Sequence, residues 1–139
     1  MATTERKSIK PVIYQLFPRL FTNTCDKCVP FGTIEQNGVG KMNDITDFVL
    51  SKIKDLGITH VWYTGVIEHA QATTYPGITH DNHHVVKGKA GSPYAIKDYY
   101  DIDPDIAVDV DNRLGEFRSL VERTHRAGMK VIIDFVPNH

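Results

Sequence analysis

The sequence predicts an α/β fold in which parallel strands alternate with helices. Three short apolar runs, Val12–Phe17, Thr59–Tyr63 and Val131–Ile133, are separated by two segments whose apolar residues recur at helical spacing. The last run is continuous and β-branched, which is typical of a parallel strand covered on both faces. Strands that alternate with helices in this way pair in parallel and connect through right-handed crossovers.

The first predicted helix follows a polar loop that contains several glycine and proline residues. Asn43 or Asp44 can cap its amino terminus, and Gly57 supplies a left-handed residue that ends it after Leu56. Its apolar residues repeat at the spacing of one helical face. This face consists of Ile45, Phe48, Val49, Ile53 and Leu56.

The second predicted helix extends from about Asn112 to Ala127 and ends at Gly128. Its apolar face consists of Leu114, Phe117, Leu120 and Val121. Between the second strand and this helix lies a long loop at about 64–109, for which we predict no regular structure. Loops of that length are uncommon in compact domains and usually bind ligands or cover a site.

The composition is that of a water-soluble globular chain, with 41% hydrophobic and 24% charged residues. Sixteen basic and seventeen acidic residues give a net charge of -1, which argues against a nucleic-acid or anionic-membrane partner. The amino-terminal ten residues contain no apolar segment of the kind found in a signal peptide, and no stretch is long enough to span a membrane. We therefore expect a cytoplasmic protein.

Three parallel strands and two helices do not by themselves form a closed fold. A (β/α)8 barrel, also called a TIM barrel, contains eight strands and about 250 residues, and this chain has the pattern of about three of its β/α units. No linker divides the 139 residues, so we interpret 1–139 as one incomplete barrel. The first and third strands would each leave an open edge, which predicts self-association of the isolated chain.

Two motifs follow the second and third predicted strands. Gly91–Pro104 contains the pattern Tyr-x-x-x-Asp through Tyr94 and Asp98, and the chain ends on Asp-x-Val-x-Asn-His at Asp134–His139. These motifs, together with the opening Tyr14–Arg19, resemble the α-amylase family, glycoside hydrolase family thirteen. The resemblance covers essentially the whole chain, with both motifs in the family's order. It implies the amino-terminal part of a catalytic barrel.

The resemblance also implies roles for individual residues. His139 would donate a hydrogen bond to the sugar in the subsite where cleavage occurs. Tyr94 would stack on the same sugar, and Asp98 belongs to the same substrate-binding motif. Asp134 would support the site by anchoring an arginine on the next strand. Asn138 would lie where many members of the family offer a calcium ligand.

The reaction implied by the resemblance is retaining cleavage of α-glucosidic bonds in starch-like or malto-oligosaccharide substrates. Such enzymes need two carboxyl groups about 5 Å apart, which in this family come from later strands. We therefore expect no catalytic residue in this chain and no activity from it alone. Ala95 replaces an aspartate found in members that trim single glucose units, which favours an oligosaccharide-accepting cleft.

Two alternatives to hydrolysis remain open at this stage. A transglycosylase or isomerase of the same family would share these first three strands. A small non-catalytic module that binds carbohydrate or metal could use Tyr94, the histidine cluster and the cysteine pair. Zinc bound in stoichiometric amount would favour such a module, and malto-oligosaccharide turnover would favour the enzyme.

Three polar clusters have simpler interpretations. Six aspartates between Asp98 and Asp111 imitate part of a calcium loop but lack its glycine and its final glutamate, so we expect a solvated acidic loop. The histidines form a polar loop tip rather than a transition-metal site, and the cysteines form a loop pair that is reduced or loosely bridged. These residues are His80, His83, His84, Cys25 and Cys28.

Overall fold

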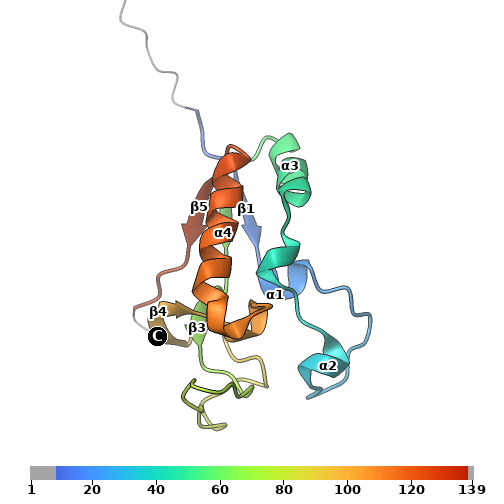
Figure 1. The fold of residues 1–139 in the computed structure, drawn as a ribbon, viewed down its shortest axis with the longest axis vertical. Helices are drawn as coiled ribbons and strands as arrows, with labels where there is room; N and C mark the ends of the chain where they lie inside the picture. Colours follow the sequence, from blue (N-terminus) through green and yellow to red (C-terminus); the bar gives the residue numbers. More distant parts are fainter. Residues whose placement is uncertain (1–8, 138–139) are drawn as a thin grey trace, which may run out of the picture.

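A computed structural model describes residues 9–137 of the chain (Figure 1). Five strands, four α-helices and three short 3-10 helices follow one another in this described part. Their order is β1 (Ile13–Leu16), α1 (Pro18–Phe21), α2 (Ile34–Asn37), η1 (Met42–Asp44), α3 (Asp47–Asp55), β2 (His60–Tyr63), β3 (Ile67–His69), β4 (Ile96–Ile102), η2 (Pro104–Ile106), η3 (Val110–Asn112), α4 (Arg113–Arg126) and β5 (Lys130–Ile133).

The three predicted strands form one parallel sheet in the order β1-β2-β5. Gln15, Trp62 and Ile132 lie at the same level of the sheet, because β1 pairs with β2 and β2 with β5 in that register. The two connections contain α3 and α4, as a β/α repeat requires. The predicted α/β fold with a parallel sheet is therefore confirmed. Self-association through the free edges of β1 and β5 stays a prediction.

The two faces of this sheet differ in how they are covered. Leu16, Val61 and Tyr63 belong to the hydrophobic core on one face, where α4 contacts β5 and also packs against α3. On the opposite face Ile13 is half exposed, and Trp62 and Ile132 are only partly buried. Helices cover the outside of a (β/α)8 barrel. The uncovered face thus corresponds to the side that faces a barrel interior.

The first long helix begins later than the sequence predicts. Thr46, rather than Asn43 or Asp44, caps α3, because its hydroxyl oxygen accepts a hydrogen bond from the Val49 amide at 3.3 Å. Residues 42–44 form the separate 3-10 helix η1. The predicted apolar face is partly wrong. Its members Phe48 and Leu56 are both 69% exposed, whereas Leu50, which was not included, is fully buried.

Residues 50 and 53 are separated by about one helical turn, so they share the side of α3 that meets the core. Phe48 and Leu56 lie at angles that place them away from it. The predicted apolar face therefore combined residues from two different sides of α3.

The second long helix matches its predicted bounds to within one residue at each end. Its buried positions are Glu116, Leu120 and Thr124, which are four residues apart and therefore share one face. Thr124 lies against the hydroxyl group of Tyr63 at 2.7 Å, and this links α4 to β2. Leu114, which was predicted to belong to the apolar face, is 42% exposed.

The long loop at 64–109 contains more structure than the sequence indicates. Strands β3 and β4 pair in antiparallel fashion, with register shifts on both sides of Glu68, and the 3-10 helix η2 follows β4. The earlier loop contains the short helices α1 and α2. Strand β3 has three residues, a length at which periodicity carries no signal. Strand β3 forms because β4 pairs with it, whereas a local capping box of Thr33 and Gln36 begins α2.

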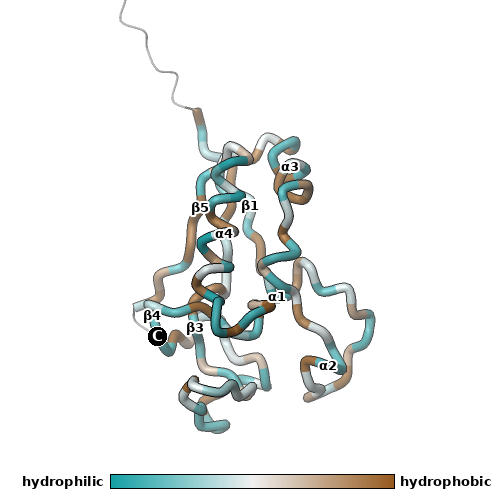
Figure 2. Tube along the Cα trace, in the orientation of Figure 1, coloured by the Kyte–Doolittle hydropathy of each residue, from teal (hydrophilic) through white to brown (hydrophobic). Residues whose placement is uncertain are grey.

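Polar and apolar residues are distributed as this arrangement requires. Figure 2 shows apolar stretches along β1 and β5, whereas much of α4 and of the loops below the sheet is hydrophilic. In the described part of the chain, no helix is both long enough and apolar enough to cross a membrane.

The packing of α4 leads to a prediction about stability. Leu120→Ala removes a fully buried side chain and leaves a cavity, so we expect it to lower the free energy of unfolding by about 2–5 kcal/mol. Leu114→Ala makes the same change on the same helix at an exposed position, and we expect it to cost about 1 kcal/mol or less. Denaturant unfolding measures both. Equal losses from the two variants would contradict the packing described here.

Candidate functional site at the carboxyl edge of the sheet

The carboxyl ends of β1, β2 and β5 lie at the same edge of the sheet, because the three strands are parallel. The loops that contain α1, α2, β3 and β4 gather at this end of the molecule, in the lower half of Figure 1. Polar groups at the carboxyl edge of a parallel sheet are where α/β proteins place their functional residues.

Asp134 directly follows β5 and contacts the uncovered face of the sheet. Its Oδ1 accepts a hydrogen bond from the indole nitrogen of Trp62 at 2.7 Å. Its Oδ2 is buried and has no hydrogen-bond partner among the described residues. A buried carboxylate oxygen without a donor is costly. Asp134 is thus held in position with one acceptor free, as a residue that anchors a further donor would be.

Tyr94 and Asp98 lie at the start of β4, on the loop side of the same edge. Tyr94 is 40% exposed, and its amide donates to the Ser92 hydroxyl group at 3.3 Å. Asp98 is exposed and accepts from the Tyr100 amide at 2.8 Å. Both residues are therefore accessible to a ligand. His139 and Asn138 lie outside the described residues, so their predicted roles are not tested.

A tyrosine that the sequence did not single out fastens this loop to the end of β5. The hydroxyl group of Tyr99 donates to the carbonyl oxygen of Val136 at 2.7 Å, and its ring lies 5.7 Å from the ring of Phe135. These contacts bring β4 next to the residues that follow Asp134. The two motifs, separated in sequence, therefore meet in the fold.

The predicted solvated acidic loop is only partly correct, because Asp98, Asp109 and Asp111 are exposed but two other aspartates are not. Asp103 and Asp105 are fully buried. Asp105 Oδ2 accepts from Arg19 Nη1 at 2.8 Å, and Asp105 Oδ1 accepts from the Tyr75 hydroxyl group at 2.6 Å. The side-chain amide nitrogen of Gln71 also donates a hydrogen bond to Asp105 Oδ1, at 3.3 Å. We call these residues, together with His69 and Lys41, the buried carboxylate cluster. Arg19, which pairs directly with Asp105, comes from α1, far away in sequence.

The side chain of Lys41 binds backbone carbonyl oxygens of the cluster segment. Its Nζ donates to the carbonyl oxygens of Asp105 at 2.6 Å and Ala107 at 3.0 Å. Burial lowers the pKa of this ammonium group, and the nearby carboxylates of Asp105 and Asp103 act in the opposite direction. Burial also raises the pKa of Tyr75, as does its hydrogen bond to Asp105. The tyrosine therefore stays a neutral donor at any physiological pH.

Asp103 occupies the least satisfied position of the cluster. Its Oδ1 accepts from the Asp105 amide at 3.0 Å, but its Oδ2 has no hydrogen-bond partner in the described part of the chain. His69 Nε2 lies 3.9 Å and Arg19 Nη1 lies 4.0 Å from that oxygen. Burial raises the pKa of Asp103 to about 6, although the charge of His69 acts to lower it.

A second group of carboxylates, Glu68, Asp98 and Asp101, could in principle hold a metal ion. Two of them already have cationic partners. Asp101 forms a two-pronged ion pair with Arg113, and Lys97 Nζ lies 3.6 Å from Glu68. Burial alone would raise the pKa of Asp101, but its hydrogen bonds to Arg113 and to the Ile102 amide lower it overall. An ion at this group would compete with Arg113 for Asp101 and with Lys97 for Glu68.

The histidine and cysteine clusters do not converge on a metal site either. The ring centroids of His83 and His84 lie 4.0 Å apart with the rings tilted by 39°, and both residues are exposed. Cys25 and Cys28 are free thiols, and the Cys25 Sγ donates to the Gln36 carbonyl oxygen at 3.4 Å. Within residues 9–137, no metal-binding group of three side chains includes a histidine or a cysteine. The structure thus agrees with a reduced cysteine pair.

Comparison with known proteins gives the family. Residues 15–139 match the family described as "Alpha amylase, catalytic domain". The chain belongs to the α-amylase family. The sheet β1-β2-β5 with α3 and α4 is accordingly the amino-terminal portion of the family's (β/α)8 barrel, as the sequence predicted.

Relatives within the α-amylase family include several enzymes. A cyclomaltodextrin glucanotransferase from Bacillus licheniformis is 31% identical over 121 residues, which are 86% of this chain and 14% of the relative. A trehalose-6-phosphate hydrolase from Bacillus subtilis is 30% identical over 78% of this chain and 15% of the relative. Maltase A2 from Drosophila melanogaster is 28% identical over 91% of this chain and 16% of the relative. The chain thus spans a small part of the length of these enzymes.

Solved structures agree with this assignment. A trehalose-6-phosphate hydrolase from Bacillus licheniformis superposes with a TM-score of 0.58 at 29% identity, over 93% of this chain and 17% of that one. A maltogenic alpha-amylase from Thermotoga neapolitana gives a TM-score of 0.55 at 28% identity, over 90% of this chain and 22% of that one. Both comparisons support a fold shared with α-amylase family enzymes.

The raised pKa of Asp103 leads to a prediction about pH. The folded state holds this proton more tightly than an unfolded chain does, since the pKa rises from 3.8 to about 6. The stability that the proton provides is complete below about pH 4 and is lost as the pH rises through about 6. We therefore expect the native protein to lose more unfolding free energy between pH 4 and 7 than its Asp103→Asn variant. A constant difference between the two across that interval would contradict the prediction.

Proposed function

We propose that the native protein cleaves α-glucosidic bonds of malto-oligosaccharides or starch-like glucans with retention of configuration. The observation that carries this proposal is the geometry of Asp134. The residue is fixed by Trp62 at the carboxyl edge of a family barrel, with one buried oxygen that has no hydrogen-bond partner within residues 9–137. Tyr94 and Asp98 are accessible on the loop that Tyr99 fastens beside it.

Each of these residues would contribute binding or support rather than bond cleavage. The Tyr94 ring offers an apolar face for the C–H face of a pyranose, and Asp98 offers a carboxylate to its hydroxyl groups. His139 would donate a hydrogen bond to the same sugar. Asp134 would accept from an arginine on the next strand of the barrel through its free Oδ2. Such support at strand ends keeps a site within the tolerance that catalysis needs.

The catalytic pair would lie on later strands of the barrel. Retention requires two carboxyl groups about 5 Å apart. The carboxylates of Asp98 and Asp134 are already engaged by the Tyr100 amide and by Trp62. Isolated residues 1–139 should therefore be inactive. Asn138 could add a calcium ligand, because side-chain carbonyl oxygens suit that ion.

Transfer to another sugar, rather than to water, is a second candidate. Its support is the identity of 31% to a cyclomaltodextrin glucanotransferase. Residues 9–137 place no group that selects water over a sugar as the acceptor. The two outcomes differ in products, since transfer yields longer or cyclic glucans and hydrolysis yields only shorter ones.

Turnover of maltoheptaose tests the proposed function. We expect the native protein to release shorter malto-oligosaccharides whose new reducing ends have the α configuration, as observed by NMR during the first turnovers. Residues 1–139 alone should release none. Products of β configuration, or turnover by residues 1–139 alone, would contradict the proposal. Products longer than maltoheptaose would favour transfer.

Replacement of Tyr94 tests its place in the site. We expect Tyr94→Ala to reduce kcat/KM for maltoheptaose by the equivalent of about 2–4 kcal/mol, in line with the loss of one positioned group. Tyr100→Ala is the matched control, because Tyr100 is a tyrosine in β4, just after the loop that contains Tyr94, and is 92% exposed. It should leave kcat/KM nearly unchanged. An unchanged value for Tyr94→Ala would remove Tyr94 from the site.

A further inference from the structure

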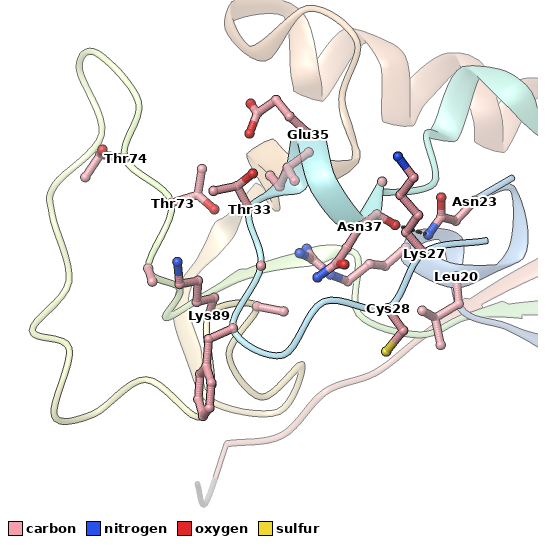
Figure 3. Close-up of a pocket in the computed structure, with 18 residues that line it drawn as sticks. Leu20, Asn23, Lys27, Cys28, Thr33, Glu35, Asn37, Thr73, Thr74 and Lys89 are labelled. Atoms are coloured by element: carbon pink, nitrogen blue, oxygen red, sulfur yellow. Dashed lines mark hydrogen bonds between the residues drawn. The ribbon is translucent and has the colours of Figure 1, made fainter. Parts of the chain in front are cut away.

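A hollow of about 710 Å³ lies between the two loops at the carboxyl end of the sheet. One wall consists of residues between Arg19 and Gly38, and the other consists of residues 72–74 and 88–90. Figure 3 shows this space, with Thr33, Glu35 and Asn37 on the α2 side and Thr73 and Lys89 on the opposite loop. Its lining includes neither Tyr94 nor Asp134, so it is separate from the site described above.

Phe31 in this lining is unusual in both backbone and exposure. Its side chain is 80% exposed, and its φ of +55° makes it the single non-glycine residue with a positive φ in the described part of the chain. A bulky side chain in the left-handed region is strained, and such strain is concentrated at functional positions. Burial could offset the strain, but this ring remains in water. Neither the local conformation nor the core therefore explains why a phenylalanine occupies this position.

The loop that carries Phe31 is fixed rather than loose. Asn37 Oδ1 accepts from the Val29 amide at 2.7 Å, and Asn37 Nδ2 donates to the Val29 carbonyl oxygen at 2.9 Å. The Gly32 amide donates to the same carbonyl oxygen at 2.9 Å. Three hydrogen bonds thus close the turn around Phe31. The ring is presented to the hollow from a prearranged backbone, and prearrangement reduces the entropic cost of binding.

The two walls are held at a fixed separation by the buried carboxylate cluster. Arg19 belongs to the first wall, and Tyr75 directly follows Thr74 of the second. Both donate to the carboxylate of Asp105, at 2.8 Å and 2.6 Å. The hollow is therefore a permanent feature of the fold rather than a gap between independent loops.

The polar side chains around the ring indicate the class of ligand. The side chains of Thr73, Thr74, Lys27 and Lys89 make no hydrogen bond or ion pair within residues 9–137, so their donors are free. Glu35 adds an exposed carboxylate to the lining, and this mixture of signs does not select an anion. An aromatic face surrounded by free hydroxyl, ammonium and carboxylate groups matches a neutral sugar ring, which has an apolar C–H face and a polar rim.

We propose that this hollow binds one sugar unit of a malto-oligosaccharide, stacked on Phe31, at a distance from the unit that is cleaved. The ligand class rests on the proposed function, but the site rests on the hollow and on Phe31. A bound chain would engage the carboxyl edge of the sheet and the hollow together. Long oligosaccharides would then bind more tightly than short ones.

Three replacements of Phe31 in the native protein, compared with a control, test the proposal. We expect Phe31→Ala and Phe31→Gly to weaken maltoheptaose binding about 10-fold by calorimetry, and to weaken maltose binding much less, because a disaccharide is too short to engage the sheet edge and the hollow together. Phe31→Trp keeps an aromatic face and should retain the affinity. Phe48→Ala is the matched control, since Phe48 is an exposed phenylalanine on α3 outside the hollow.

The glycine variant separates binding from folding. Glycine adopts a positive φ without strain, so Phe31→Gly should keep or raise the Tm while it loses affinity. A structural role for the ring would instead lower the Tm. The proposal would be overturned by unchanged maltoheptaose affinity in Phe31→Ala and Phe31→Gly. It would also be overturned by an equal loss of affinity for maltose and maltoheptaose, or by no binding of maltoheptaose to the native protein. Binding that depends on Phe31 without any turnover would refute the proposed function and leave the hollow as a glucan-binding site.

Discussion

The carboxylate of Asp105 joins segments of the chain that the sheet alone would leave apart. It is fully buried and accepts hydrogen bonds from Arg19, Tyr75 and Gln71. Arg19 follows β1, whereas the other two donors precede β4. A buried ion pair adds little by itself, but removal of one partner costs about 3–5 kcal/mol because the remaining charge is left unpaired. The pair therefore specifies one arrangement of the two loops.

Both places that we associate with sugar binding depend on this arrangement. The loop that contains Tyr94 and β4 leads directly into η2, where Asp105 is anchored. The hollow near Phe31 has its walls tied together by the same carboxylate. Functional loops need a rigid scaffold if their side chains are to be positioned accurately. Here a polar contact, rather than the hydrophobic core, supplies the rigidity at the carboxyl end of the sheet.

The sheet contributes a different constraint, which is the separation of its two faces. Side chains alternate along each strand, so Leu16 and Tyr63 enter the core under the helices while Gln15 and Trp62 lie on the other face. Trp62 then reaches Asp134 at the edge. The strand register thus determines which side chains of the open face support the rim. In the barrel of the α-amylase family, that open face is the interior.

The sequence by itself determined the elements whose signal is local. The three parallel strands follow from short apolar runs, and α4 follows from a periodic pattern that ends at Gly128, so its predicted and observed bounds differ by one residue at each end. The sequence motifs also singled out Asp134, Tyr94 and Asp98, which the fold brings to one edge. A motif depends only on residue types and their order in the chain, and folding does not change that order.

The tertiary structure decided whatever depends on distant partners. Asp103 and Asp105 resemble solvated aspartates until Arg19, 86 positions before Asp105, neutralises the cluster. Strand β3 is too short to show a period and exists because β4 pairs with it. Within α3, Thr46 competes successfully with Asn43 and Asp44 as the cap because residues 42–44 form a separate turn. Burial and pairing are properties of segments that meet in space, and a sequence pattern confined to one segment does not contain them.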